Sequence, residues 1–462
     1  MNSFLFARAF AIGVVAVFSL WLIDAQRAQA ETLTAPSAHA IAQFGTPPPA
    51  KTGPLSTNLS AALQSLIASS FDQANWGEVA ESSLKTIAQS EDPRLVWLIR
   101  DLMRFTWRRE ANDALAKTGA AILGIEFETI YRRRELMDHL IAWQVPAYPG
   151  YLPDKRTVLT KYVPGWERIL VEGEIDWRLV AWGGVNIDDR PYDTTDEPCI
   201  CIPAIDNPQV STAEEATWLK DDDVVFGIEI NGEYRAYPRR IMEVREMVND
   251  TLGGRDLGIP YCTLCGAAQA FFTDEMPPGV ERPVLRTSGL LIRSNKVMYD
   301  VATFSVFDTF LGKAVTGPLA EIGLQLKQAT VITTDWGTWK AEHPETTVLV
   351  EALALGRDYD LRNTRDARGP IFPIGDVDPR LPVHEDVVGV VTASGQAVAF
   401  QQTKAIAALK SGAEVEFANV RLQLAAGGVK LVSDDGADLG SHQAFWFAWS
   451  QFHPTTALWP EQ

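Results

Sequence analysis

Hydrophobic positions divide the chain into a helical part followed by a strand-rich part. Over Ser60–Trp143, apolar residues recur every three to four positions, as in Leu95, Leu98 and Leu102, while Gly and Pro are scarce. This spacing is typical of amphipathic helices. We therefore expect three to five helices, packed as a small bundle or a short solenoid, over residues 59–150.

Beyond Pro146 the pattern changes to that of short strands. Val224–Tyr237 contains two strand-like runs around Asn231-Gly232, a dipeptide that favours a type I′ turn because both residues tolerate positive φ. Further hairpin turns are predicted near Gly253-Gly254, Ala425–Gly427 and Asp434–Gly436. The expected fold class is α+β, with an N-terminal helical region followed by a β-rich, internally duplicated domain.

Two sequence matches support the duplication. Asp222–Tyr237 aligns without gaps on Glu385–Phe400, with the turn glycine in register. A Trp-x-x-Trp-x-x-x-His-Pro-x-Thr pattern then closes each half, starting at Trp336 and at Trp446. Because the matches occur in the same order, each half is predicted to open with one hairpin and to close with one tryptophan-rich helix.

The histidines are assigned mainly to structure. His343 and His453 end the two tryptophan-rich helices, since a residue before Pro is disfavoured in the α region. A feature kept in both halves is most economically explained by packing, so both receive a structural role. His384 and His442 are isolated in the sequence and are expected at the surface.

These patterns predict a linear domain order. The segments are an export signal over 1–30, a Pro/Ala-rich linker over 31–58, a helical domain over 59–150, a connecting segment with a Cys-x-Cys pair over 151–221, a first β-rich unit with a CxxC insertion over 222–346, a connection over 347–384 and a second β-rich unit over 385–456.

The N-terminus has the three-part layout of a secretory signal. Arg8 supplies the positive charge, Ala9–Ile23 is apolar, and Ala28-Gln29-Ala30 is a small-x-small cleavage site. The alternative is an N-terminal membrane anchor, but the apolar run falls short of the roughly 20 residues that span a bilayer. The mature protein is expected in the periplasm or outside the cell, with loose or no membrane association.

Charge excludes one class of partner. The formal net charge is −18, whereas nucleic-acid binding needs a surplus of Lys and Arg. A local basic cluster in the helical region, Arg104, Arg108, Arg109 and Arg132–Arg134, is predicted to be a solvated helix face. The alternative is a docking surface through which the helical region binds an acidic envelope protein.

The four cysteines form the candidate site. Cys262 and Cys265 lie in a CxxC turn between two predicted strands, which resembles a metal knuckle more than a thioredoxin-type helix start. Tetrahedral zinc needs four ligands, and the remaining thiols are Cys199 and Cys201. Copper or zinc would suit such thiolates. Two alternatives remain open, structural disulfides, which an oxidising compartment favours, and redox-active thiols.

Several motifs resemble one family. Ile202–Pro208, Glu229–Pro238, Val248–Thr251, Tyr261–Gly266, Ser288–Leu291 and Val297–Asp300 closely resemble the domain of unknown function 3179 family. The resemblance covers about Ile202 to Thr456 and implies an exported or membrane-associated β-rich domain of unestablished activity. Relatives usually carry His where this chain has Arg245, and Pro where it has Thr263. If that His is a metal ligand or acid/base, this chain has lost it, because Arg neither ligates a metal nor takes a proton near neutral pH.

Polar residues near the CxxC turn are weaker candidates. They are the pocket residues Asn249, Asp250, Ser288, Asn295, Tyr299 and Asp300, which are also ordinary turn formers. No known phosphate-binding or nucleophile motif accompanies them. Two functions therefore compete: an exported protein whose CxxC turn binds a thiophilic metal or performs thiol redox chemistry, and a non-enzymatic envelope binding module with structural disulfides.

Overall fold

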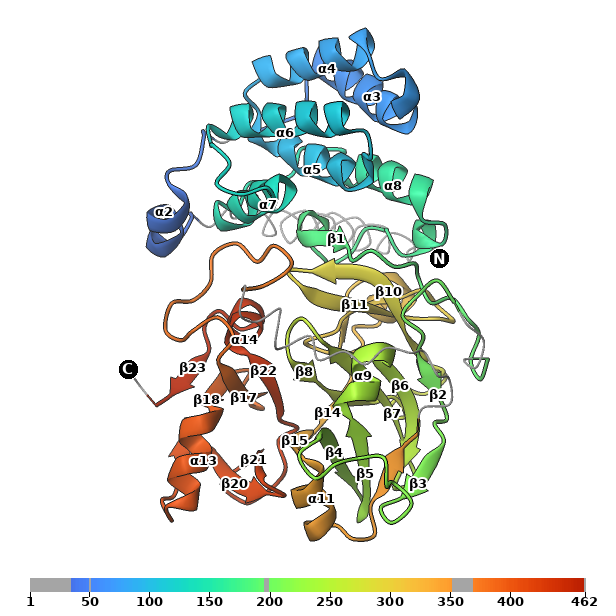
Figure 1. Cartoon of the computed structure of the whole chain (residues 1–462), viewed down its shortest axis with the longest axis vertical. Helices are drawn as coiled ribbons and strands as arrows, with labels where there is room; N and C mark the ends of the chain where they lie inside the picture. Colours follow the sequence, from blue (N-terminus) through green and yellow to red (C-terminus); the bar gives the residue numbers. More distant parts are fainter. Residues whose placement is uncertain (1–34, 50, 195–198, 351–368, 461–462) are drawn as a thin grey trace, which may run out of the picture.

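A helical region packs at one end of a β-rich region, as the sequence predicts (Figure 1). The computed structural model describes residues 35–49, 51–194, 199–350 and 369–460, so the predicted export signal lies outside the described residues. Within those ranges no helix has both the length and the apolar character needed to cross a membrane. The α-helices that build the N-terminal region are α2 (Ala38–Phe44), α3 (Thr57–Phe71), α4 (Glu78–Gln89), α5 (Val96–Phe105), α6 (Arg109–Leu123), α7 (Arg132–Ala142) and α8 (Tyr151–Tyr162).

The helical region is longer than predicted at both ends. Helix α2 lies inside the segment predicted as a linker, where Ser37 caps its N-terminus. Helix α8 follows the predicted boundary at residue 150, and its Lys155 is fully buried against Asp101 of α5. The pattern of apolar residues misses α8 because a buried ion pair, rather than an apolar stripe, attaches part of this helix to its neighbour.

The arginines of the basic cluster differ in their exposure to solvent. The side chain of Arg109 is 91% exposed, as expected for a solvated helix face. Arg133 is instead largely withdrawn from water, and burial lowers its pKa to about 10. The prediction of one solvated face is therefore wrong for Arg133. Helix α7 packs on α5, and this side chain is largely buried near other charged groups.

The described residues of the β-rich region form five sheets. Three of them belong to residues 180–349 and two to the C-terminal part. In spatial order, the first sheet holds β1 (Val180–Trp182), β10 (Leu285–Ile292), β11 (Asn295–Asp300), β12 (Val306–Asp308) and β13 (Lys313–Ala314). The second holds β14 (Gln328–Ala329), β9 (Ala270–Phe272), β7 (Arg255–Cys262), β6 (Met247–Leu252) and β2 (Ile205–Asp206), with β8 (Ala267–Ala268) paired to β7.

The remaining sheets carry the repeated sequence patterns. The third sheet holds β15 (Ile332–Asp335), β4 (Val224–Ile230), β5 (Glu233–Pro238), β16 (Thr347–Leu349) and β3 (Val210–Thr212). The fourth holds β22 (His442–Phe445), β17 (Asp386–Val391), β18 (Ala397–Gln401) and β23 (Ala457–Trp459). The fifth holds β19 (Glu416–Phe417), β20 (Val420–Ala425) and β21 (Gly428–Val432). Helices of this region are α9 (Arg239–Arg245), α10 (Gly317–Glu321), α11 (Trp336–Glu342), α13 (Gln402–Lys410) and α14 (Trp446–Phe452).

The predicted hairpins are largely confirmed. Asn231 and Gly232 join β4 to β5 with φ of 52° and 81°, the positive values that a type I′ turn needs. Gly253 and Gly254 join β6 to β7 in the same way. Ala426 and Gly427 lie between β20 and β21. Residues 434–436 form a turn that an antiparallel bridge between Val432 and Asp438 closes.

The third and fourth sheets share strand order and direction. In each, a central hairpin is flanked by an antiparallel strand that leads into a tryptophan-rich helix, and the strand after that helix returns parallel to the hairpin. Gly227 pairs with Ala236, and Gly389 pairs with Ala399, so the second hairpin loop is one residue longer. The gapless sequence alignment is thus one residue out of register before the turn.

A glycine–tryptophan contact occurs once in each of these two sheets. A Cβ added to Gly227 would lie 2.1 Å from the Trp339 ring, and one added to Gly389 would lie 2.3 Å from the Trp449 ring. Each indole N–H donates to a threonine hydroxyl seven residues later, at 2.9 Å in both cases. Glycine at these strand positions therefore leaves space for the indole ring.

The cap of α11 permits a first test. Asp335 accepts hydrogen bonds from the Thr338 backbone N–H at 2.8 Å and from the Thr338 hydroxyl at 2.9 Å. Asp335→Ala is expected to lower the free energy of unfolding by about 1 kcal/mol, because the N–H loses its acceptor. Urea denaturation measures this loss. Asp335→Asn keeps an acceptor and should lose less; an equal loss in both variants would contradict capping.

Candidate functional site

The CxxC turn connects two paired strands, as predicted. Strand β7 ends at Cys262, β8 begins at Ala267, and the two strands pair antiparallel. The Cys265 N–H donates to the Cys262 carbonyl at 3.1 Å, and Gly266 closes the turn with φ of 60°. This geometry places both sulfurs on the inside of the protein rather than at the start of a helix.

Neither cysteine of the turn is in a disulfide, and both are buried. Their exposed fractions are 3% for Cys262 and 0% for Cys265. Cys262 Sγ lies 3.5 Å from the Ser294 carbonyl oxygen and Cys265 Sγ lies 3.6 Å from the same oxygen. The two thiols therefore share one acceptor on the turn that connects β10 to β11.

Asn295 gives Cys265 a second polar neighbour. Its Oδ1 lies 3.6 Å from Cys265 Sγ, while its buried Nδ2 has no hydrogen-bond partner among the described residues. Because the two ends of an amide are assigned from their partners, a flipped amide would direct its N–H groups at the sulfur. Such an N–H would stabilise a thiolate at Cys265, whereas Oδ1 accepts from the thiol.

The surroundings of Cys262 lower the pKa of its thiol. Burial would raise its pKa, and the Glu246 carboxylate acts in the same direction. The Cys265 thiol, the Lys296 backbone N–H and the Lys296 ammonium outweigh these effects and lower the pKa of Cys262 below its ordinary value. A thiolate is thus favoured at Cys262, and the thiolate is the reactive form of cysteine.

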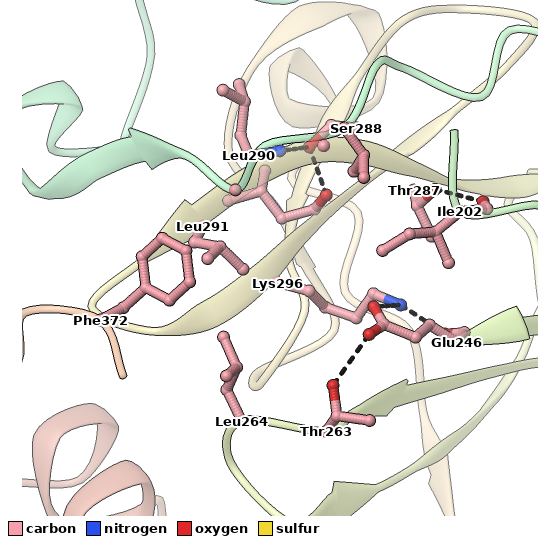
Figure 2. Close-up of a pocket in the computed structure, with 14 residues that line it drawn as sticks. Ile202, Glu246, Thr263, Leu264, Thr287, Ser288, Leu290, Leu291, Lys296 and Phe372 are labelled. Atoms are coloured by element: carbon pink, nitrogen blue, oxygen red, sulfur yellow. Dashed lines mark hydrogen bonds and ion pairs between the residues drawn. The ribbon is translucent and has the colours of Figure 1, made fainter. Parts of the chain in front are cut away.

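A buried ion pair stands beside the turn (Figure 2). The Lys296 ammonium lies 3.2 Å from a carboxylate oxygen of Glu246 and also donates to the Glu246 backbone carbonyl. The other carboxylate oxygen of Glu246 accepts from the Thr263 hydroxyl at 2.9 Å. The CxxC turn is therefore tied to the ion pair through the residue that follows its first cysteine.

The ion pair lies at the wall of a cavity of about 160 Å³. Thr263 and Leu264, the two residues between the cysteines, line this cavity together with Phe372 and Leu291 (Figure 2). Its remaining lining comes from Gly183, Val185, Ile202, Thr287, Ser288, Gly289, Leu290 and Val297. The space is large enough for a small ring-sized group or several waters, and it adjoins the CxxC turn.

Arg245 occupies the position where relatives usually carry His. It ends α9 and is 1% exposed, and its guanidinium donates to the Pro203 carbonyl at 3.4 Å. The next residue, Glu246, caps the helix in a left-handed conformation and reaches the cavity. Arg245 is therefore buried without lining the cavity, whereas the next residue, Glu246, does line it.

The second cysteine pair forms a disulfide with itself. Cys199 and Cys201 are joined, so the four cysteines do not form one ligand set. The one group of three or more His, Cys, Asp or Glu ligand atoms among the described residues is Asp188 with these two cysteines, within 4.8 Å of one another. Asp188 already accepts from the Arg190 guanidinium and the Ala204 N–H, so it could take a metal only after reduction of the disulfide and loss of these bonds.

The six predicted pocket residues separate into two groups. Ser288 lines the cavity, and Asn295 touches Cys265. The other four, Asn249, Asp250, Tyr299 and Asp300, make hydrogen bonds elsewhere in the fold, to Asp206, Arg235, the Asp188 carbonyl and Thr303 respectively. These four therefore do not line this cavity.

The histidine assignments are partly corrected. His343 and His453 each cap a tryptophan-rich helix and pack on its second tryptophan, in keeping with a structural role. His442 was expected at the surface but is 3% exposed, because it lies in β22 between Phe310 and Trp449. An isolated histidine on an interior strand gives no periodic signal of its own burial.

Sequence reasoning missed the residues that complete the site. Lys296 comes from β11, Glu246 from the end of α9, and Phe372 from the segment that begins at residue 369. The only local signals are the family motifs near residues 248 and 297, which flank Glu246 and Lys296 without singling them out.

Comparison with known proteins yields one match. A model of the family described as a protein of unknown function (DUF3179) matches residues 200–434, about half of the chain. No curated protein and no solved structure matches the chain. The matched residues include the CxxC turn, Glu246, Lys296 and Phe372 but not the helical region.

Proposed function

The chain belongs to the family described as a protein of unknown function (DUF3179), and we propose that its function is thiol–disulfide exchange at Cys262 and Cys265. One observation carries this proposal: two cysteines that are not disulfide-bonded share a turn and an acceptor beside the buried Lys296–Glu246 pair. The lowered pKa of Cys262 supports a nucleophilic role for this sulfur.

The chemistry follows the usual two displacements. The Cys262 thiolate attacks one sulfur of a partner disulfide and releases the other as a thiolate. Cys265 then loses its proton and attacks Cys262 in the mixed disulfide, which releases the partner as a dithiol and leaves Cys262–Cys265 oxidised. The partner gains the two electrons that the cysteines lose. Lys296 favours the thiolate of Cys262, and Glu246 holds the Lys296 ammonium beside the turn.

A copper or zinc centre is the alternative function of the CxxC turn. Among the described residues, no third His, Cys, Asp or Glu ligand accompanies Cys262 and Cys265 within 4.8 Å. The Asn295 amide is a polar side chain beside Cys265, and its Oδ1 lies 3.6 Å from the sulfur. Zinc favours four strong ligands, so two thiolates alone support redox chemistry better than a zinc site. Copper(I), which accepts fewer ligands, is tested below.

Two further inferences concern the compartment of the protein and its evolutionary origin. We infer export through residues 1–30, on the sequence layout described above, and an origin of residues 222–346 and 385–456 by duplication. The common strand order and the two glycine–tryptophan contacts support the duplication. The CxxC turn lies in the part of the first unit that the second lacks, so the shared parts serve as scaffold.

Redox titration tests the proposed exchange. The mature chain is equilibrated in glutathione buffers of increasing oxidation, alkylated, and analysed by peptide mass spectrometry. We expect Cys262 and Cys265 to change together between two free thiols and one disulfide. Cys262→Ser should lower the rate at which the protein reduces a disulfide substrate by at least 100-fold. Ser294→Ala keeps the backbone carbonyl acceptor and should retain most of this rate.

Three outcomes would count against exchange. Thiols that stay reduced throughout the titration would contradict it, as would a Cys262–Cys265 disulfide that resists reduction, which would favour the binding-module alternative. One equivalent of copper or zinc in protein purified under reducing conditions, lost in Cys262→Ser, would replace exchange with a metal site.

A further inference from the structure

Two arginines at the base of the helical region are withdrawn from water without an acidic partner. Arg104 lies on α5 and Arg133 on α7, and these helices pack together (Figure 1). No hydrogen bond or ion pair joins either guanidinium to another described residue. Because moving a charge out of water is costly unless the charge is paired, two such groups on packed helices need an explanation.

Neighbouring residues fix the position of the Arg104 guanidinium. Its guanidinium lies 4.8 Å from the centre of the Trp182 ring, and its Nε is buried without an acceptor. A Cβ on Gly184 would lie 2.9 Å from its Nη2, so glycine leaves the space that this nitrogen occupies. The aromatic ring and the glycine hold the planar group in one place, with donor N–H groups unused.

The nearest carboxylate does not neutralise the two arginines. Asp101 is bound by the Arg100 guanidinium at 2.9 Å, by the Lys155 ammonium at 3.2 Å and by the Tyr151 hydroxyl at 2.8 Å. One negative charge is thus already shared by two cations. The Nε of Arg100 is buried with no acceptor among the described residues, which adds a further unused donor beside the pair.

The charges in this cluster act on one another. Burial lowers the pKa of Arg133 to about 10, and the positive charges of Arg104 and Arg100 contribute in the same direction. Burial also lowers the pKa of Arg104. A bound anion would reverse each of these effects, since it pairs with the guanidinium groups and supplies the missing acceptors.

We propose that Arg104 and Arg133 form a binding site for a small oxyanion, a carboxylate or phosphate group, between α5, α7 and Trp182. Guanidinium groups match both anions because each presents parallel N–H donors to two oxygens. In a chain with a net charge of −18, this uncompensated basic cluster would draw an anion to one place. The site lies outside residues 200–434 and does not depend on thiol exchange.

Thermal unfolding of the mature chain tests the site. Melting temperatures are measured in sodium phosphate, sodium succinate and sodium chloride at matched ionic strength. A specific anion should raise the midpoint by several degrees over chloride, because it binds the native state alone. A rise in phosphate only identifies a phosphoryl ligand, and a rise in succinate only identifies a carboxylate.

Variants separate binding from folding. Arg133→Met should abolish the rise while leaving the midpoint in chloride unchanged or higher, because an unpaired charge is removed. Arg109→Met, at a side chain that is 91% exposed, should keep the rise. If Arg133→Met does not fold, Arg133→Lys replaces it and should weaken the apparent affinity at least tenfold. The proposal would be overturned if the anion raised the melting temperature of the Arg133 variants as much as that of the unchanged protein. Equal melting temperatures in all three salts would overturn it too.

Discussion

Arg286→Met is expected to lower the free energy of unfolding by about 3–5 kcal/mol, since it leaves a buried carboxylate without its cation. The Arg286 guanidinium makes two hydrogen bonds to Asp206, one of them at 2.7 Å, and both side chains are 0% exposed. It also donates to the Arg190 and Pro191 carbonyls. One residue of β10 thus holds both β2 and the loop that precedes it.

The measurement is urea denaturation of the protein at neutral pH. Arg255→Met is the matched control, because Arg255 also pairs with an aspartate, Asp274, but both side chains are more than a fifth exposed. That variant should lose no more than about 1 kcal/mol. Equal losses in the two variants would contradict the account of a buried pair. The double change Arg286→Met with Asp206→Leu should recover part of the stability, because it removes both charges.

Local turn chemistry made much of the β-rich region predictable. Asn231-Gly232 and Gly253-Gly254 require positive φ, which few residue types tolerate, so the sequence and the structure agree there. The tryptophan-rich helices are equally local, since both begin at a tryptophan and end at a histidine before proline. The one-residue difference in the second hairpin was not predictable, because its loop carries only one strong turn residue, Gly395.

Burial of charged groups was the least predictable part of the fold. Lys155 and Arg133 look like surface residues in the sequence, yet both are withdrawn from water by the packing of helices. Only the folded structure shows that Asp101 and Tyr151 surround Lys155. Polar contacts of this kind leave no periodic pattern, so the helical boundary at residue 150 was placed one helix too early.

The candidate site was half predictable for a related reason. The CxxC spacing identifies Cys262 and Cys265 in the sequence, and Gly266 indicates the turn. Lys296 and Glu246 reach the same place from separate strands and helices, through the pairing of β10 with β11 and of β6 with β7. Their partnership is a product of the sheet arrangement. The Cys199–Cys201 disulfide likewise follows from the conformation of an irregular loop.

Acidification is expected to weaken the fold through two buried histidines. Burial lowers the pKa of His442 to about 3, helped by the nearby charge of His453, and burial lowers the pKa of His453 to about 4. In the unfolded chain both titrate near the ordinary value of about 6.5. Between these limits the unfolded state binds protons that the native state excludes, so the stability present above pH 6.5 is lost as the pH falls.

The size of this effect can be tested residue by residue. Between pH 7.5 and pH 5 each histidine should remove about 2 kcal/mol from the free energy of unfolding. Urea denaturation at both pH values should therefore show a difference that His442→Gln reduces by about 2 kcal/mol. His343→Gln, at the half-buried histidine of the first tryptophan-rich helix, should reduce it less, because the imidazole keeps part of its contact with water. If His442→Gln left the pH dependence unchanged, His442 would not be the buried neutral imidazole that its place between Phe310 and Trp449 requires.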